Sequence, residues 1–399
     1  MKESLGKILI IVENLPLPFD RRVWMESNTL CKEGYEIFIV CPKGKGYDKD
    51  FEEINNIKIY RHPLPPEKSS ALGYLREYSH ALFYEWKLAR KIYKQNNFDV
   101  IQACNPPDFI FLVALWFKLF HKVKFVFDHH DLNPELYESK FNKKGFFYYF
   151  LKVAERLTFM SANMVMSTNE SYKEVAITRG RVKEEKVHVV RSGPDLNLFN
   201  LKPANSTYKK GKNFLVGYLG VMGEFDGVDH FIKAIGIIIN EKKRKDIQFC
   251  LIGSGPCFED LQALSTHLGI TDYVEFTGRI SDDELLKRLS TCEVCVNADP
   301  LNPLNDKSTM NKILEYMALS KPIVQYDLVE GKRSAGEASI YAKPNDIQDF
   351  ADKIIELIDD EQKRLKMGMI GRKRMEDKLE WKHQSKKLIN AYQNLFKEI

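Results

Sequence analysis

The chain has 399 residues, of which 44% are hydrophobic and 29% charged, the balance of a soluble globular protein large enough for two domains. The formal net charge of +5 is small for this length, and we find no motif that combines aromatic and basic residues for nucleic-acid binding, so we expect no nucleic-acid partner. The seven cysteines are scattered, most of them in apolar segments, which indicates buried thiols in the cytoplasm.

The first half of the chain alternates short apolar runs with helical patterns. A helix is expected at 21–33, with Gly34 as its C-cap, and a long helix at 72–95. Strands are expected at 7–13, 35–41, 57–60, 99–103, 124–127, 164–167 and 187–190. This alternation predicts a parallel, doubly wound sheet.

The same rhythm restarts in the second half, after a segment rich in proline, glycine and lysine. Strands are expected at 215–219, 248–252, 273–276, 294–297 and 323–326, and later helices at 345–357, 362–375 and 381–396. The sequence therefore predicts an α/β protein with two Rossmann-like domains that face a cleft, where a ligand binds at the carboxyl ends of the strands. The predicted parts are the first domain at 1–195, a linker at 196–213, the second domain at 214–377 and a final helical segment at 378–399.

Two arginines follow the first strand at the start of the predicted helix. Arg21 and Arg22 oppose the helix dipole, which favours acidic residues at that end. Their placement predicts an anionic ligand or a buried carboxylate partner, and the alternative is simple pairing with Asp20. Asn105, after the strand at 99–103, is either a helix cap or a residue that faces the ligand.

Two histidines stand at the end of the strand at 124–127. Because side chains alternate along an extended chain, only one of His129 and His130 can face the ligand. An imidazole in that position can bind a sugar hydroxyl or transfer a proton. The alternative is a buried histidine bonded to Asp128 or Asp131. Adjacent histidines on opposite faces also make a metal site at this loop a poor prediction.

Three glycine-bearing loops follow successive strands of the second half. They contain Gly220 and Gly223, then Gly253, and then Gly278 with Arg279. Glycine lets a backbone approach a phosphate closely, and three such loops at one sheet edge predict a nucleotide site. Arg279 and the neighbouring backbone are candidates to hold the base.

The segment from 297 to 325 combines a strand, a polar loop, a helix and a further strand. Ser308 and Thr309 are expected to cap the helix or to contact an anion at its N-terminus. Glu315, one to two turns further, can reach a ribose diol. The alternative is a capped helix whose Glu315 faces solvent.

Several sequence blocks resemble glycosyltransferases of the GT-B architecture, in the large retaining family four. These are GSGP at 253–256, FTGR at 276–279 and EYMALSKPIV at 315–324. FDRRV at 19–23 and DHHDLNPE at 128–135 resemble a bacterial branch of that family, whose members build cell-surface polysaccharides.

The resemblance implies a role for individual residues. Glu315 would bind the donor ribose, the loop at 220–223 the donor phosphates, and Arg279 with Ile280 the base. His130 would lie near the transferred sugar. The last helix would cross back onto the first domain.

The chain departs from that family at its expected charges. Lys307 stands where the family often has a glutamate, and Met222 or Gly223, with Asp226, stands where it usually has an arginine and a lysine. A diphosphate leaving group needs compensating positive charge. Lys307 and Lys312 are the nearest candidates in sequence, with the two arginines of the first domain, and our hypothesis is that Lys307 supplies the charge.

The resemblance implies a metal-independent hexosyl- or N-acetylhexosaminyl-type transferase that needs no cofactor. A nucleotide-diphosphate sugar would be its donor and a glycan or a lipid-linked molecule its acceptor, in cell-envelope or exopolysaccharide biosynthesis. The alternatives are a sugar-nucleotide epimerase of the same architecture, which needs no acceptor, and a non-catalytic nucleotide-sugar-binding scaffold, which the missing cations favour.

A basic and aromatic segment suggests a membrane contact. Lys140, Lys143 and Lys144 precede the run FFYYFL at 146–151, a combination that can dock on the cytoplasmic face of the inner membrane. The alternative is a core helix with a solvated flank. The longest apolar run, 109–117, is far too short to span a bilayer, and we find no signal peptide.

Overall fold

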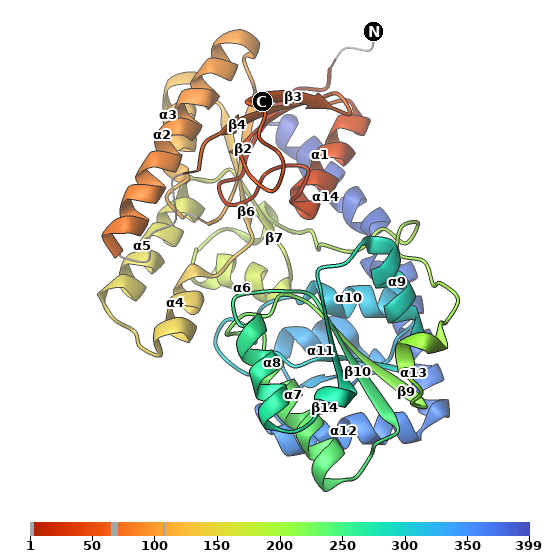
Figure 1. The fold of residues 1–399 in the computed structure, drawn as a ribbon. Helices are drawn as coiled ribbons and strands as arrows, with labels where there is room; N and C mark the ends of the chain where they lie inside the picture. Colours follow the sequence, from red (N-terminus) through yellow and green to blue (C-terminus); the bar gives the residue numbers. More distant parts are fainter. Residues whose placement is uncertain (1–3, 65–70, 107) are drawn as a thin grey trace. The chain divides into compact units, whose positions relative to one another are not determined.

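The computed structural model describes residues 4–64, 71–106 and 108–399. It divides into two compact units, Met1–Arg191 with Gln384–Ile399, and Ser192–His383. Figure 1 shows each unit as a sheet covered by helices, with the end of the chain returning to the first unit. Among the described residues, no helix has both the length and the apolar character needed to cross a membrane.

The first unit is built on an eight-stranded sheet in the described part of the chain, with the order β3-β4-β2-β1-β5-β6-β7-β8. Its neighbouring strands pair in parallel except β3, which pairs antiparallel with β4. The strands are β1 (Lys7–Ile11), β2 (Glu36–Pro42), β3 (Phe51–Ile54), β4 (Ile57–His62), β5 (Val100–Cys104), β6 (Lys124–His129), β7 (Met164–Ser167) and β8 (Val187–Val189). The parallel arrangement brings the loops after β1, β5 and β6 to one edge of the sheet.

Helices cover both faces of this sheet. They are α1 (Arg21–Glu33), α2 (Ala71–Asn96), α3 (Phe111–His121), α4 (Asn133–Phe141), α5 (Phe146–Ser161), α6 (Glu170–Thr178) and most of α14 (Trp381–Phe396). The bounds predicted for α1 are confirmed. Asp20 accepts a hydrogen bond from Val23 N at its start, and Gly34, with a φ of 118°, ends it.

The second unit has a six-stranded parallel sheet in the order β11-β10-β9-β12-β13-β14. Its strands are β9 (Phe214–Leu219), β10 (Ile247–Ile252), β11 (Val274–Gly278), β12 (Val294–Asn297), β13 (Ile323–Tyr326) and β14 (Ser339–Ala342). Its helices are α7 (Val228–Gly236), α8 (Phe258–His267), α9 (Asp282–Thr291), α10 (Asn311–Ala318), α11 (Val329–Ala335), α12 (Ile347–Asp359) and α13 (Glu361–Arg374). The prediction of two parallel α/β sheets is confirmed.

The short edge elements were not predicted. β3 contains two glutamates and has an exposed Phe51, and β14 is four residues long. Neither segment has a long apolar run, because an edge strand is buried by one neighbour only. Residues Ser192–His383 belong to the second unit, where 206–209 form a single 3-10 turn.

Gly253, directly after β10, lies where two loops of the second unit meet. Its φ is 133°, and a Cβ atom there would lie 1.9 Å from the carbonyl oxygen of Gly220. Gly269 also has a left-handed φ, of 67°, but a Cβ atom there would meet nothing within 4 Å. A substitution at Gly269 therefore introduces backbone strain alone, whereas one at Gly253 introduces strain and a steric clash with Gly220.

We expect Gly253→Ala to lower the free energy of unfolding of this unit by about 3 kcal/mol or more, since strain and a steric clash add. Gly269→Ala, the matched control, should cost about 1–2 kcal/mol from strain alone. Urea denaturation of both variants measures the difference. Equal losses would show that the Gly220–Gly253 approach is not tight in solution.

Candidate functional site

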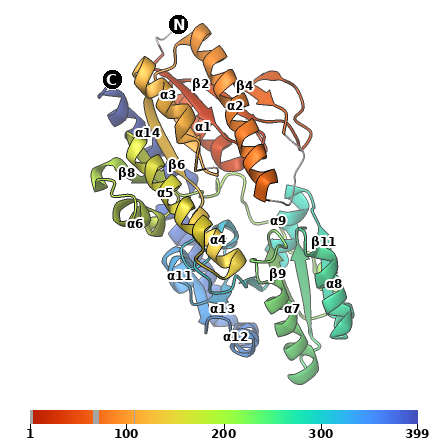
Figure 2. The same cartoon turned by 90° about the vertical axis from the view of Figure 1, so that its left-hand side faces the viewer.

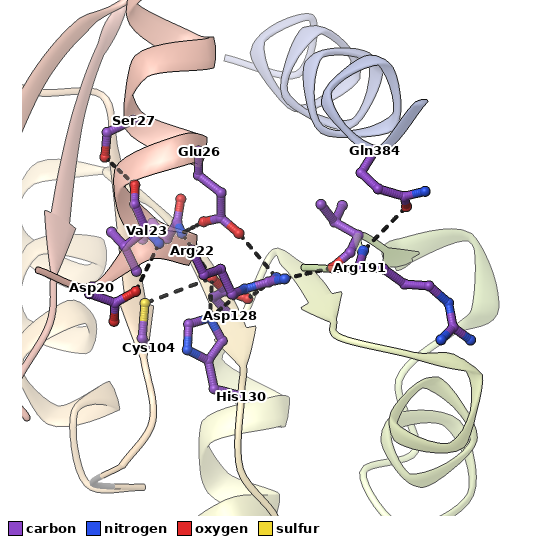
Figure 3. A network of polar contacts seen from close by, with 12 residues as sticks. Asp20, Arg22, Val23, Glu26, Ser27, Cys104, Asp128, His130, Arg191 and Gln384 are labelled. Atoms are coloured by element: carbon purple, nitrogen blue, oxygen red, sulfur yellow. Dashed lines mark hydrogen bonds and ion pairs between the residues drawn. The ribbon is translucent and has the colours of Figure 1, made fainter. Parts of the chain in front are cut away.

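A buried ion-pair network occupies the edge of the first unit where β6 and the start of α1 meet. Arg22 Nη2 lies 3.1 Å from Asp128 Oδ1 and 3.0 Å from Glu26 Oε1 (Figure 3). Arg22 Nη1 donates to the carbonyl oxygen of Val190 at 2.7 Å. Of the two partners predicted for Arg22, an anionic ligand or a buried carboxylate, the structure shows buried carboxylates, and Asp20 caps the helix.

His130 is joined to this network through one ring nitrogen. Its Nε2 lies 2.7 Å from Asp128 Oδ2 and 2.9 Å from Arg22 Nε. Arg22 Nε–H is always a donor and Asp128 Oδ2 is an acceptor, so which of the two contacts is a hydrogen bond depends on whether Nε2 carries the ring proton. The side chain of His130 is 17% exposed.

The charges of the network shift one another's pKa values. Burial by itself would lower the pKa of His130, but the charge and hydrogen bond of Asp128 more than offset it and raise this pKa. Burial alone would raise the pKa of Asp128, whereas Arg22 and His130 hold it well below its usual range. Burial raises the pKa of Glu26 to about 8 despite Arg22. Asp128 is therefore the permanent anion that orients His130.

Two residues that the sequence analysis missed support this anion. Gln102 of β5 donates from Nε2 to Glu26 Oε2 at 2.8 Å and to Asp128 Oδ2 at 3.1 Å. Tyr392 of α14 donates its hydroxyl to Gln102 Oε1 at 2.5 Å. The sequence does contain a sign of this role, since Gln102 is a glutamine inside an otherwise apolar strand and a buried amide requires hydrogen-bond partners. The returning helix thus helps to hold the carboxylate behind His130.

His129 lies apart from this network, in the core of the first unit. Its ring packs 5.3 Å from Phe127, 5.0 Å from Phe159 and 5.0 Å from Tyr172, measured between ring centroids. Burial lowers its pKa to about 3, so the ring is neutral. The alternation of the strand therefore buries one histidine and presents the other.

Asn105 shapes the loop that carries His130 and Asp131. Its Oδ1 accepts from the backbone N–H groups of His130 at 2.8 Å and Asp131 at 3.2 Å, and its Nδ2 donates to Asp131 O at 2.7 Å. Burial raises the pKa of Asp131. Arg21 is exposed at the start of α1. The structure thus gathers Arg22, Asn105, His130 and Asp131 at one sheet edge, with Asp20 as the neighbouring helix cap.

Cys104, Asp128 and His130 offer ligand atoms within 4.8 Å of one another, as a metal site would. The guanidinium of Arg22 already supplies the positive charge that a metal ion would bring, because it contacts both Asp128 and His130. Burial also raises the pKa of the Cys104 thiol, which disfavours the thiolate that binds metals. These charges fit an ion-pair network better than a metal centre.

In the second unit, three glycine loops are bonded to one another. Gly220 N donates to Ile252 O at 3.0 Å, and Gly253 N donates to Gly278 O at 3.1 Å. Met222 N donates to Ser254 O at 3.1 Å, which holds the first two loops together. The loops after β9, β10 and β11 therefore form one continuous backbone surface at the carboxyl ends of the strands.

Asp226 has a structural task in the first of these loops. Its Oδ2 accepts from Gly223 N at 2.9 Å. The N–H groups of Gly220 and Gly223 are thus both bonded within the protein, so these glycines contribute close backbone approach rather than donors to a ligand.

Of the two alternatives predicted for Ser308 and Thr309, a helix cap or a contact with an anion, the helix cap is wrong. α10 begins at Asn311, its N-cap is Met310, and no side chain caps it. Ser308 Oγ instead donates to Leu304 O at 2.8 Å, directly after the turn at 303–307. The first N–H groups of α10 are consequently left without the side-chain cap that the sequence suggested.

Lys312 on α10 is a buried, paired cation. Its Nζ lies 3.3 Å from Asp299 Oδ2 and 4.9 Å from the centre of the Tyr218 ring. Burial alone would lower the pKa of Lys312, but Asp299 raises it above its ordinary value. A Cβ atom on Gly220 would lie 3.2 Å from Lys312 Cε, so this pair supports the first glycine loop from beneath.

Lys307 lies in a turn that is bonded to the first glycine loop. Asn305 Nδ2 in this turn donates to Phe225 O at 3.0 Å, and Asp306 Oδ1 accepts from Val329 N at 2.9 Å. Lys307 is half-buried, as is Glu315 on α10.

The two candidates for the base lie at the end of β11. Arg279 is exposed, whereas Ile280 is half-buried and packs against a core cluster of the second unit. The structure thus places every candidate for donor binding at the carboxyl edge of the second sheet or on α10.

Two family models match the chain. Residues 20–198 match a model described as Glycosyltransferase Family 4, and residues 213–360 match one described as Glycosyl transferases group 1. The first match covers most of the first unit and the second most of the second unit, whereas Tyr392 of α14 lies outside both.

Curated relatives are distant in sequence. The capsular polysaccharide biosynthesis glycosyltransferase CapM of Staphylococcus aureus is 26% identical over 277 residues, which are 64% of this chain and 68% of that protein. An uncharacterized glycosyltransferase of Methanocaldococcus jannaschii is 22% identical over 377 residues, 92% of this chain and 91% of that protein.

Solved structures share the fold. Sucrose-phosphate synthase from Thermosynechococcus elongatus superposes with a TM-score of 0.82 at 17% identity, over 99% of this chain and 100% of that chain. HepE of Anabaena in complex with UDP-glucose gives a TM-score of 0.74 at 16% identity, over 98% of this chain and 100% of that chain.

The Asp128–His130 contact yields a prediction about pH. We expect Asp128→Asn to lower the pKa of His130, because the stabilising charge is lost while burial still disfavours the imidazolium. NMR titration of the ring protons measures this, with His130→Gln to assign the signal. The exposed Asp272→Asn is the control and should leave the pKa of His130 unchanged. An unaltered pKa in Asp128→Asn would exclude the contact.

Proposed function

Because the chain belongs to the GT-B glycosyltransferases of family 4, we propose that it moves a sugar from a nucleoside-diphosphate sugar to an acceptor hydroxyl with retention of configuration. The observation that carries the proposal is the joined surface of three glycine loops beside the uncapped start of α10. Backbone surfaces of this kind at the carboxyl ends of parallel strands accommodate nucleotide phosphates. The solved HepE structures, which hold UDP and UDP-glucose, share this fold.

We assign the donor to the second unit and the acceptor to the first. Glu315 would bind the ribose, Arg279 and Ile280 the base, and the first N–H groups of α10 a phosphate. His130, whose Nε2 contacts Asp128, would meet a hydroxyl of the transferred sugar. Asp131 and Asn105 border the same place, where an acceptor hydroxyl would be oriented.

The structure bears on the choice between the two lysines. Asp299 compensates the charge of Lys312 in a buried pair. Lys307 lies in a turn joined to the glycine loop through Asn305. We therefore propose that Lys307 balances the developing charge of the diphosphate, in a reaction that requires no metal.

The kind of sugar and its destination are further parts of the proposal. We propose a hexosyl or N-acetylhexosaminyl transfer to a glycan or a lipid-linked acceptor in envelope or exopolysaccharide assembly. The likeness to CapM, which is named for capsular polysaccharide biosynthesis, supports this role.

One observation favours a non-catalytic scaffold instead. Asp226 stands where a family cation is expected and is already committed to Gly223 N. A panel of UDP-, GDP- and TDP-sugars, assayed for hydrolysis, epimerisation and transfer to glycan acceptors, separates the possibilities. Transfer with a retained anomer is the expected outcome. Epimerisation without an acceptor, or binding without turnover for every donor, would overturn the proposal.

Lys307→Ala should reduce kcat with saturating donor by about a hundredfold or more, because several kcal/mol of transition-state stabilisation is lost. Lys287→Ala on α9, at a half-buried lysine paired with Asp283, is the matched control and should retain full turnover. Near-full turnover of Lys307→Ala would remove this lysine from the mechanism.

Glu315→Ala should weaken donor binding by about tenfold or more, since a charge-assisted hydrogen bond to the ribose is removed. Isothermal calorimetry with the donor identified by the panel measures the affinity, and thermal unfolding checks that the variant is folded. An unchanged donor affinity would contradict the assignment of Glu315.

A further inference from the structure

α5 exposes an apolar stripe along its whole length. Phe146 is 80% exposed at its start and Met160 is 66% exposed at its end. Between them Tyr149, Val153 and Leu157 are also exposed, at the spacing of one helical face. Rings and aliphatic side chains therefore face outward on a helix whose other face packs against the first unit.

α3, which packs beside α5, also exposes apolar side chains. Phe120 is 68% exposed, and Leu112 and Leu119 are exposed as well. α3 and α5 lie side by side (Figure 2), and Lys118 Nζ on α3 donates to Ser161 O at the end of α5. An apolar surface that extends over two adjacent helices is larger than scattered exposed residues explain and marks an interaction site.

The exposed charges next to this surface are mostly positive. Segments 109–127 and 139–167 contain a single acid, Glu155, which is buried and paired with Arg179 at 2.6 Å. The exposed charged side chains of the second segment include Lys140, Lys143, Lys144 and Arg156. Glu138 lies 3.2 Å from Lys144 and offsets part of this charge. The apolar stripe is thus bordered by cations.

We propose that this surface, formed by the exposed faces of α5 and α3 with the basic loop 140–144, docks the protein on an anionic lipid bilayer. The rings would enter the boundary between head groups and acyl chains, and the lysines would contact lipid phosphates. A second copy of the chain is a poorer occupant, because a twofold contact of this surface would bring its cations together. The docking does not depend on the proposed sugar transfer.

Co-sedimentation of the full chain with vesicles tests the docking. We expect binding to vesicles of equal phosphatidylglycerol and phosphatidylcholine, little binding to pure phosphatidylcholine, and release as salt rises from 0.1 to 0.5 M. Absence of binding to the anionic vesicles overturns the proposal. Equal, salt-independent binding to both kinds of vesicle also overturns it, since that is non-specific adsorption.

Two variants assign the contact to this surface. Lys143→Glu should weaken vesicle binding more than the roughly fivefold expected for the loss of one lysine, since it also reverses a charge. Phe146→Ser should weaken it by about tenfold or more. Both side chains are exposed, so both variants should remain folded, which circular dichroism verifies.

Matched controls lie on α13 of the second unit. Lys366→Glu changes an exposed charge and Met369→Ser an exposed apolar side chain outside the docking surface, and both should bind vesicles as the unaltered protein does. Equal losses in the controls, or unchanged binding in Lys143→Glu and Phe146→Ser, would refute the assignment. Self-association that Phe146→Ser abolishes, without lipid binding, would identify a second copy as the occupant.

Discussion

The buried pairing of Arg22 with Asp128 is the interaction on which the first site depends. A guanidinium and a carboxylate are costly to bury unless each finds its partner with good geometry. Their pairing holds the start of α1 against the end of β6. Arg22 Nη1 also donates to Val190 O, directly after β8. Because Asp128 also binds His130, the orientation of the imidazole follows from the position of Arg22.

The last helix strengthens the same arrangement from a distant part of the sequence. Tyr392 on α14 reaches the network through Gln102, and Gln384 accepts from the backbone N–H of Arg191. The last helix therefore supplies hydrogen-bond partners to the side chain of Gln102 and to the backbone N–H of Arg191, which would otherwise be buried without them. The end of the chain is therefore part of the support behind His130.

The second unit achieves its site by backbone packing rather than by a charge network. Gly253 lets its loop approach the carbonyl oxygen of Gly220 closely, and Gly253 N donates to Gly278 O. Lys312 and Asp299 form a buried pair below this surface. The contrast suits the two proposed tasks, because a diphosphate needs close backbone approach whereas a reacting sugar needs an oriented side chain.

Local patterns in the sequence determined the two parallel sheets, the bounds of α1 and the sheet edges that carry the polar loops, because periodicity and caps act over a few residues. The placement of Arg22 at a helix N-terminus also predicted an anionic ligand or a buried carboxylate partner, without deciding between them. Only the tertiary structure shows that Asp128 and Glu26 are the partners of Arg22 and that Lys312 pairs with Asp299. It also shows that His129 is buried and that α10 begins after Ser308 and Thr309. It also shows that the apolar stripe of α5 is exposed. These outcomes depend on burial and on distances between residues far apart in the chain, which packing decides and local sequence does not.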